Sequence, residues 1–244
     1  MKVIILAGGK GTRLNDYTTT IPKPMVKVGN IPILIHIINI YSHYRHNEFF
    51  IAAGYKHNII FDYFKKKGDV IYYKKNHLKV EYLSNIINII FTGLNTQTSG
   101  RLIKLKKYVE DENFLLTYGD GLSDININTL TNFHYNHKKI VTITAVHPPA
   151  RFGELFLNKN NVIEFKEKIQ LRRGWINGGF FVLNKKIFKF LKIKNMFEND
   201  LERLVRANQI KAYKHQSFWQ CMDNLRDYEL LNKLWKKKIR PWVT

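Results

Sequence analysis

Residues 3–14 read Val-Ile-Ile-Leu-Ala-Gly-Gly-Lys-Gly-Thr-Arg-Leu, an apolar run that passes directly into a glycine-rich turn. Residues 2–7 predict a strand buried on both faces, as in a parallel sheet. Glycines after such a strand let backbone N–H groups approach a phosphate, although a simple reversal of the chain would also explain them. The order is neither that of a P-loop, which ends in Gly-Lys-Ser/Thr, nor the Gly-x-Gly-x-x-Gly of a dinucleotide-binding fold. The stretch indicates an α/β sheet with a candidate phosphate-binding turn.

Beyond that strand, strand-like and helix-like apolar patterns alternate, which predicts a doubly wound α/β sheet. From Arg151 onward the pattern is richer in strands, and we interpret this part as an elaboration packed on the first half. The expected strands are 48–53, 69–74, 86–92, 113–118, 140–146 and 176–183, with a hairpin at 154–166 around Asn160-Asn161. The expected helices are 31–44, 56–67, 99–108, 128–137, short helices within 185–206, and 224–236.

Composition limits the class of protein. The 244 residues, 45% of them hydrophobic, are enough for one large domain with a sizeable core. No apolar run reaches the ~18 residues of a membrane span, and the N-terminus lacks a signal-peptide pattern, so we expect a cytoplasmic protein with no membrane partner. Cys221 is the only cysteine, which excludes an internal disulfide and a multi-cysteine metal site.

The formal net charge of +21 would suit a polyanionic partner such as nucleic acid. A compositional bias toward Lys, Ile and Asn along the whole chain explains the charge equally simply. The lysines are scattered and form no single tail or recognition motif, so we expect no specific nucleic-acid partner. A basic cleft would nevertheless help to capture phosphorylated ligands.

Two cations follow the glycine-rich turn. Arg13 is an always-charged bidentate donor, which suits phosphate oxygens. Lys23 lies between Pro22 and Pro24, and the two prolines stiffen the segment that presents it. A lysine in a loop is usually only solvated, but one held between prolines is more plausibly aimed at a ligand.

The string Gly-Gly-x-Gly-Thr-Arg-Leu, followed after a short spacer by Pro-Lys-Pro-Met at 22–25, resembles the signature of the sugar nucleotidyltransferase family. The resemblance implies a Rossmann-like, mixed and mainly parallel sheet flanked by helices, with a β-rich sugar-binding elaboration. It implies one domain over 1–244, in which 1–150 mainly bind nucleotide and 151–244 mainly bind sugar phosphate and supply a second metal ligand. It assigns nucleotide binding to Leu6, Ala7, Gly8, Gly9, Gly11, Thr12, Arg13, Lys23, Thr98, Ser99, Gly100, Arg101, Gly119 and Asp120.

Two aspartates are candidate metal ligands. Asp120 lies between glycines at the carboxyl end of a predicted strand, where ligands bind in open α/β sheets, although such a residue often only caps a turn. Asp223 precedes a predicted helix and could be its N-cap. The resemblance implies that both bind Mg²⁺, which must also carry substrate phosphates and water. With Arg13 and Lys23 they form the expected catalytic set.

The sugar-phosphate site is also implied by the resemblance. Glu167-Lys168 and Asn177-Gly178-Gly179 are similar to two family elements in which the lysine contacts the phosphate while the glutamate and asparagine contact sugar hydroxyls. Ile169 stands where the family usually has proline. The full expected set is Tyr118, Glu167, Lys168, Asn177, Gly178 and Trp219.

The stretch Thr98-Ser99-Gly100-Arg101-Leu102 is similar to the Thr-Gly-Gly-Arg-Leu of the cytidylyl-transferring members, as are 149–153, 218–227 and the terminal Pro241-Trp242. This resemblance implies that a homo-oligomeric enzyme joins CTP to α-D-glucose 1-phosphate, giving CDP-glucose for deoxysugar or surface polysaccharide biosynthesis. UTP or dTTP, or another phosphorylated acceptor, would require the same chemistry. A non-catalytic or nucleic-acid-binding homologue is the alternative outside the class, whereas kinase and P-loop motifs are absent from the sequence.

Overall fold

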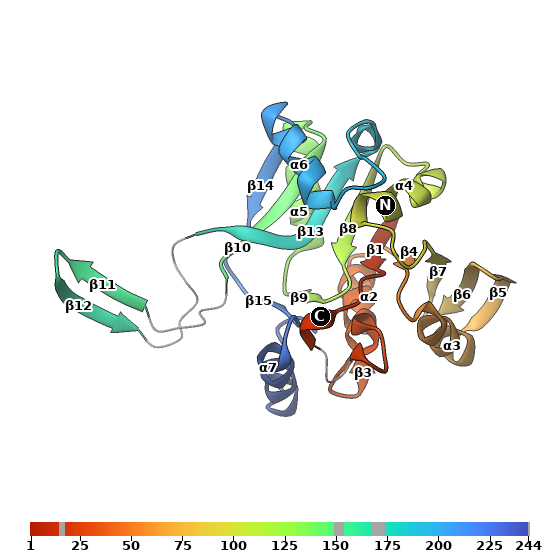
Figure 1. The fold of residues 1–244 in the computed structure, drawn as a ribbon, viewed down its shortest axis with the longest axis horizontal. Helices are drawn as coiled ribbons and strands as arrows, with labels where there is room; N and C mark the ends of the chain where they lie inside the picture. The colour runs from red at the N-terminus through yellow and green to blue at the C-terminus, as the bar shows by residue number, and fades with distance from the viewer. Residues whose placement is uncertain (15–17, 149–153, 167–173, 244) are drawn as a thin grey trace.

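A nine-stranded sheet forms the centre of the protein (Figure 1). The computed structural model describes residues 1–14, 18–148, 154–166 and 174–243. In order across the sheet, the strands are β14 (Ile210–Lys214), β10 (Val141–Val146), β13 (Ile176–Asn184), β8 (Asn113–Tyr118), β1 (Val3–Ala7), β4 (Glu48–Ala53), β7 (Asn85–Phe91), β6 (His77–Tyr82) and β5 (Asp69–Lys74). Only β13 and β6 run against the other strands. The predicted fold class, a mixed and mainly parallel sheet, is therefore confirmed.

Helices cover both faces of the sheet, and each face has its own hydrophobic core. In β1, Val3 and Ile5 pack in one core while Ile4 and Leu6 pack in the other, which explains the uninterrupted apolar run. The first core includes residues of α2 (Ile33–His43), α3 (His57–Lys67), α5 (Ile127–His137) and α7 (Leu225–Lys236). The second includes residues of α4 (Thr98–Leu105), the 3₁₀ turn η4 (Lys185–Lys189) and α6 (Phe197–Arg206).

Small elements connect these layers. The strands β9 (Gly121–Ser123) and β15 (Trp219–Cys221) pair antiparallel, with Gly121 opposite Cys221. Because Asp120 and Asp223 flank this pairing, it brings two distant parts of the chain to one place. The other small elements are η1 (Thr12–Leu14), η2 (Lys23–Met25), η3 (Lys106–Tyr108), the pair β2 (Lys27–Val28) and β3 (Ile31–Pro32), and the hairpin β11 (Glu154–Asn158) and β12 (Asn161–Lys166).

Most predicted elements match the structure. The strands at 48–53, 69–74 and 113–118 have the predicted bounds, and the hairpin turns one residue earlier than expected, at Lys159-Asn160. Two strands of the main sheet, β6 and β14, were not predicted. In β6 only Leu78 and Val80 are buried, and they alternate with the charged Lys79 and Glu81. Such alternation indicates a half-buried strand, and the signal was missed because it is short.

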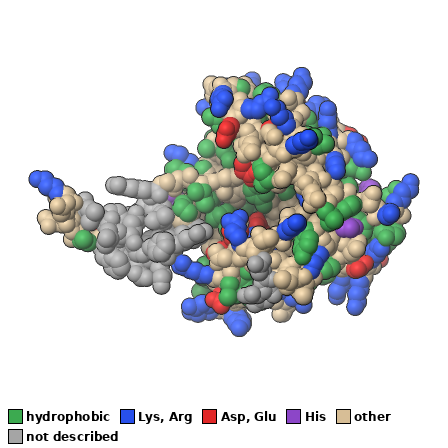
Figure 2. Space-filling view, in the orientation of Figure 1, with side chains coloured by type: hydrophobic (Ala, Val, Ile, Leu, Met, Phe, Trp, Pro, Cys, Tyr) green, Lys and Arg blue, Asp and Glu red, His purple; other side chains and the backbone are tan. Residues whose placement is uncertain are grey.

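The positive charge is distributed rather than concentrated. Figure 2 shows Lys and Arg side chains spread over most of the visible face, with no single basic stripe. The expected absence of a specific nucleic-acid partner stays a prediction. In the described part of the chain, no helix has the length and apolar character that crossing a membrane requires.

The buried His134 of α5 should make the free energy of unfolding depend on pH. Its side chain is buried, with Nε2 3.2 Å from Asn113 Oδ1 and Nδ1 2.8 Å from Thr142 Oγ1. Since Asn113 Oδ1 can only accept, Nε2 donates and Nδ1 accepts from Thr142, as in a neutral imidazole. Burial, assisted by nearby His137, lowers the pKa of His134 to about 4.

The folded pKa lies below the unfolded value, so His134 favours folding fully above about pH 6.5. This contribution is lost as the pH falls toward the folded pKa, because the unfolded chain takes up a proton that the folded protein does not. We expect this residue alone to reduce the free energy of unfolding by about 2 kcal/mol between pH 7.5 and pH 5. Chemical denaturation at both pH values tests this, with His134→Gln as the comparison. An equal pH dependence in the wild type and the variant would contradict the assignment.

Candidate active site

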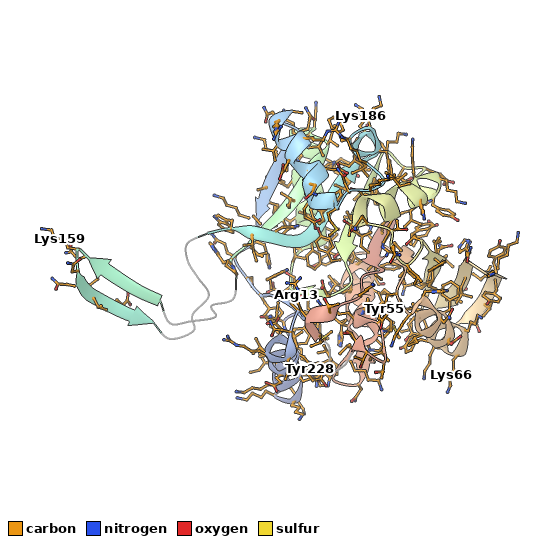
Figure 3. All side chains as sticks on the ribbon, viewed as in Figure 1. Arg13, Tyr55, Lys66, Lys159, Lys186 and Tyr228 are labelled. Atoms are coloured by element: carbon orange, nitrogen blue, oxygen red, sulfur yellow. The ribbon has the colours of Figure 1, made fainter. Side chains whose placement is uncertain are left out.

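Two cavities meet at the carboxyl ends of β1 and β8. The larger, of about 400 Å³, lies over the glycine-rich turn, and the smaller, of about 240 Å³, lies against β13 and β15. They share Arg13, Tyr118 and Asp120; Figure 3 shows Arg13 near the middle of the molecule. The predicted residues around the larger cavity are Leu6, Ala7, Gly8, Gly9, Gly11, Arg13, Lys23, Thr98, Arg101, Tyr118, Gly119 and Asp120. Those around the smaller one are Arg13, Tyr118, Asp120, Asn177, Gly178, Trp219 and Asp223.

A cluster of four charged residues lies where the cavities meet. The Lys23 ammonium is 2.8 Å from Asp120 Oδ2 and 3.0 Å from Asp223 Oδ1, and Arg13 Nη1 is 2.6 Å from Asp223 Oδ2. Burial pulls the pKa of Lys23 downward, but the Asp120 and Asp223 carboxylates outweigh it and hold that pKa above its usual value. Lys23 therefore remains charged at neutral pH. The structure brings together all four residues predicted to be catalytic.

Local backbone contacts fix the two aspartates. Asp120 precedes β9, and its carbonyl accepts a hydrogen bond from the backbone N–H of Met222, the residue after β15. Helix α7 is capped by Asn224, whose side chain accepts from Asp227 N while Asp227 accepts from Asn224 N. Asp223 is thus not the N-cap, and its carboxylate points into the charged cluster instead.

Arg101 holds the glycine-rich turn from beneath. Its Nη2 donates to Gly8 O at 2.9 Å, while Nη1 donates to Thr92 Oγ1 at 2.6 Å and to Gly93 O at 2.8 Å. Two further contacts reach Ala53 O and Leu94 O. Both Nη atoms are therefore engaged by the protein, and the side chain is almost fully buried. This geometry indicates that Arg101 positions the turn rather than reading a base directly.

Gly8 is required by this contact. A Cβ at this position would lie 2.2 Å from the Arg101 guanidinium carbon, so any other residue would push the buried guanidinium away from its acceptors. The carbonyl of Gly8 also accepts from Tyr55 N. The glycine therefore permits a close approach between the turn and the helix beneath it, a constraint that a simple chain reversal would not impose.

The predicted base-binding stretch divides into two parts. Thr98 lines the larger cavity, and its Oγ1 accepts from Phe197 N at 2.6 Å. Ser99 and Gly100 instead pack against the segment that precedes and begins α6. Ser99 Oγ donates to Asp200 at 2.7 Å, and a Cβ on Gly100 would lie 2.4 Å from Ile193 O. Thr12, in η1, is exposed and does not line either cavity.

The smaller cavity is shaped by close packing of β13 on Tyr118. Asn177 Oδ1 accepts from Gly179 N at 2.8 Å, and Trp219 Nε1 donates to Gly178 O at 2.7 Å. Gly179 has φ +79°, and a Cβ there would lie 2.7 Å from the Tyr118 ring. The Asn-Gly-Gly element is therefore part of a strand that must pass close to an aromatic ring, not a plain turn.

Two residues on the walls have strongly shifted pKa values. Burial and the neighbouring Glu198 raise the pKa of Tyr118, whose hydroxyl donates to Glu198 and accepts from Asn177. Burial, with Asp120 and other nearby carboxylates, raises the pKa of the Cys221 thiol to about 12. A neutral thiol is a poor nucleophile, so the site offers no activated cysteine.

Some expected residues fall outside the described ranges, and others were missed. Glu167, Lys168 and Ile169, and the stretch 149–153, lie outside the residues that the structure describes. The sequence reasoning missed Thr96, Gln97, Met196 and Glu198 on the wall of the larger cavity. Thr96 and Gln97 adjoin the predicted stretch, but Met196 and Glu198 come from the α6 region, and no local motif identifies them.

Comparison with known proteins decides the family. A model of the nucleotidyl transferase family matches residues 2–229. The chain belongs to this family. The glucose-1-phosphate cytidylyltransferase of Salmonella typhimurium is 40% identical over 257 residues, covering 100% of this chain and 99% of that protein. A probable glucose-1-phosphate cytidylyltransferase of Bacillus subtilis is 37% identical over 252 residues, covering 99% of each.

The fold of the chain agrees with that of solved structures. The crystal structure of HddC from Yersinia pseudotuberculosis, complexed with GMP-PN, has a TM-score of 0.73 to this chain. It is 23% identical, and the likeness covers 96% of this chain and 99% of that one. The resemblance found in the Gly-Gly-x-Gly-Thr-Arg-Leu and Pro-Lys-Pro-Met strings is thus confirmed at the level of the family. This nucleotidyl transferase has its charged cluster where its two cavities join.

Proposed function

We propose that this nucleotidyl transferase joins CTP and α-D-glucose 1-phosphate to give CDP-glucose and pyrophosphate. The observation that carries the proposal is the junction of two cavities at Arg13, Lys23, Asp120 and Asp223. One cavity suits a nucleotide and the other a sugar phosphate, so the two reacting phosphates would meet at the cluster. The full-length similarity to glucose-1-phosphate cytidylyltransferases supports the choice of CTP and glucose 1-phosphate.

The chain's role in this reaction is to position and neutralise charge. An oxygen of the sugar phosphate attacks the α-phosphorus in line, and the bond to the bridging oxygen breaks to release pyrophosphate. Since the substrate supplies the nucleophile, no covalent intermediate is needed, in keeping with the neutral thiol of Cys221. The backbone of the glycine-rich turn would hold the β and γ phosphates. Arg13, 78% exposed at the rim, and Lys23 would offset repulsion between the two anions.

The proposal includes Mg²⁺ held by Asp120 and Asp223. The donor set fits this ion: the two carboxylates already converge on one cation, the Lys23 ammonium. The described residues contain no group of three or more His, Cys, Asp or Glu side chains that could enclose a metal. Two carboxylates with the remaining positions left to phosphate and water are typical of Mg²⁺. When bound, the ion would neutralise charge on the phosphate oxygens.

Three further elements of the proposal concern cellular context. We place the enzyme in the cytoplasm, as a homo-oligomer, and its CDP-glucose in the supply of deoxysugars for surface polysaccharides. The last two follow from the family resemblance. Fractionation of the producing cell, with CDP-glucose measured after deletion of the coding sequence, would test location and role together.

Substrate competition tests the choice of base. The purified enzyme would be given CTP, UTP and dTTP in competition, with glucose 1-phosphate and Mg²⁺, and the sugar nucleotides separated by chromatography. Cytosine presents a donor where uracil and thymine present an acceptor, and a pocket built for one pattern leaves buried groups unpaired with the other. We expect CTP to have a kcat/KM at least about a hundredfold higher.

Equal or higher kcat/KM with UTP or dTTP would refute cytidylyl transfer while leaving the family intact. A parallel panel of sugar 1-phosphates, assayed by pyrophosphate release, would show whether another acceptor replaces glucose 1-phosphate. No release with any pair would favour a non-catalytic homologue.

A further inference from the structure

The edge strand β5 ends the nine-stranded sheet, and all six of its side chains are exposed. Figure 1 shows it at the right-hand end of the sheet, far from the hairpin β11–β12. Four consecutive residues are apolar and exposed: Val70 by 51%, Ile71 by 53%, Tyr72 by 38% and Tyr73 by 53%. An edge of this kind presents unpaired backbone N–H and C=O groups together with apolar surface, and it is a template for another strand.

A β-bulge in β5 determines which of its side chains share a face. In the antiparallel pair with β6, Val70 is opposite Val80 and Tyr73 is opposite Leu78, and the register shifts at Ile71. Opposite residues in such a pair point to the same side. Val70 and Tyr73 therefore lie on the side of the buried Val80 and Leu78, against α3. Without the extra residue, two positions three apart would point to opposite sides.

The charged ends of β5 share the other face. Asp69 is opposite Glu81 and Lys74 is opposite His77, both on the side away from α3. The strand thus has an acidic start and a basic end on one face, and an aliphatic start and an aromatic end on the other. Two copies of β5 placed antiparallel therefore match on both faces, with unlike charges opposite on one face and apolar residues opposite on the other.

We propose that β5 pairs antiparallel with the same strand of a second copy of this chain, about a two-fold axis between Ile71 and Tyr72. Val70 then faces the partner's Tyr73 on the α3 side, and Asp69 faces the partner's Lys74 on the other side. Each contact occurs twice, because a two-fold interface repeats every pair. The pairing covers apolar surface, satisfies the free backbone groups and opposes charges of unlike sign.

The same pattern distinguishes a second copy from an acidic partner. The positive net charge of the chain would attract any acidic extended segment, but such a segment would place a carboxylate against Asp69. Figure 3 shows Lys66 of α3 at this end of the molecule, so two copies also bring lysines toward each other. A six-residue strand pair is small beside a stable interface of about 1,200–2,000 Å². We therefore expect a reversible, concentration-dependent dimer.

Mixed cross-linking tests the register. Two single variants, Val70→Cys and Tyr73→Cys, would be purified separately, mixed and mildly oxidised. The mixture should form a disulfide-linked dimer, while each variant alone and the wild type with its half-buried Cys221 should not. This holds because opposite residues are about 4.5–5.5 Å apart between Cβ atoms, whereas a residue and its own copy are farther apart.

Charge reversal tests the contact without cysteine chemistry. Asp69→Lys and Lys74→Asp should each weaken the dimer about tenfold in sedimentation velocity, because each variant sets like charges opposite each other twice. The double variant Asp69→Lys with Lys74→Asp restores the opposite signs and should restore the dimer. Glu202→Lys, at an exposed position on α6 and away from β5, makes the same change in net charge as Asp69→Lys and is the matched control for that variant.

Two results would overturn the proposal. One is a chain that stays monomeric up to high micromolar concentration, and the other is an oligomer that neither single reversal weakens. Loss of the dimer in a single variant is not due to misfolding if the double variant restores it, and both side chains are exposed. Neither measurement depends on substrate or metal, so its outcome is separate from that of the proposed reaction.

Discussion

Replacing either Asp120 or Asp223 with asparagine is expected to reduce kcat/KM at least about a hundredfold. The loss of one preorganised charged contact at a reacting phosphate typically costs about 2.7–4 kcal/mol of transition-state stabilisation. Both carboxylates lie within 3.0 Å of the Lys23 ammonium, where the two cavities join. Removing either charge therefore weakens the proposed metal site and also the orientation of Lys23. Pyrophosphate release with saturating Mg²⁺ would measure the effect.

The control for this prediction is Asp62→Asn, which removes an exposed carboxylate of α3 that lines neither cavity. Its activity should equal that of the wild type. Each active-site variant should remain folded, since Lys23 keeps one carboxylate partner. Near-normal Mg²⁺-dependent rates in a folded Asp120→Asn or Asp223→Asn protein would refute the role of that residue. Binding of Mn²⁺, followed by its paramagnetic effect on water relaxation, would separate lost metal affinity from lost catalysis.

The fold was largely predictable because its strands carry strong local signals. β1, β4 and β8 are buried on both faces and are mostly apolar, so the sequence pattern predicts them to within one residue. β6 and β14 lie toward the two ends of the sheet and are short, with two buried side chains in β6 and none in β14, so few apolar positions mark them as strands. Strand order across the sheet depends on contacts distant in sequence, which periodicity does not report.

The site was predictable where a motif matched, and not where distant segments meet. Asp223 could be placed through family resemblance, although its sequence context alone allowed a helix cap. Only the structure shows that Asn224 caps α7 and leaves Asp223 for the charged cluster. Glu198 contacts Tyr118 across 80 residues, so no spacing rule could have joined them.

Arg101 shows the same limit most clearly: the sequence indicates an arginine near the nucleotide site but does not reveal its hydrogen-bond acceptors. An arginine near a predicted nucleotide site suggests direct contact with a ligand. Its actual acceptors are the carbonyls of Gly8, Gly93 and others, which come from three different segments of the chain. The side chain thus links the glycine-rich turn to the loops that follow β4 and β7. Its effect on the nucleotide would pass through the backbone of Gly8.

The variant Arg101→Met is expected to lower the free energy of unfolding by about 3–5 kcal/mol. It should also raise the KM for the nucleotide more than the KM for the sugar phosphate. Buried carbonyls lose their donors, and each unsatisfied group costs about 1–3 kcal/mol. Arg101→Lys should recover only part of the stability, because one ammonium cannot reach acceptors that the two Nη atoms of the fork reach together.

The exposed Arg206, at the end of α6, offers the matched control: Arg206→Met should change neither stability nor either KM. Chemical denaturation gives the free energies, and initial rates with each substrate varied in turn give the two KM values. If Arg101 bound the base directly, Arg101→Met would raise the nucleotide KM while leaving the stability of the free protein nearly unchanged. If Arg101 were only a core residue, stability would fall and both KM values would stay normal at low temperature. Loss of stability together with a selective rise in the nucleotide KM is the result that only a positioning role for Arg101 predicts.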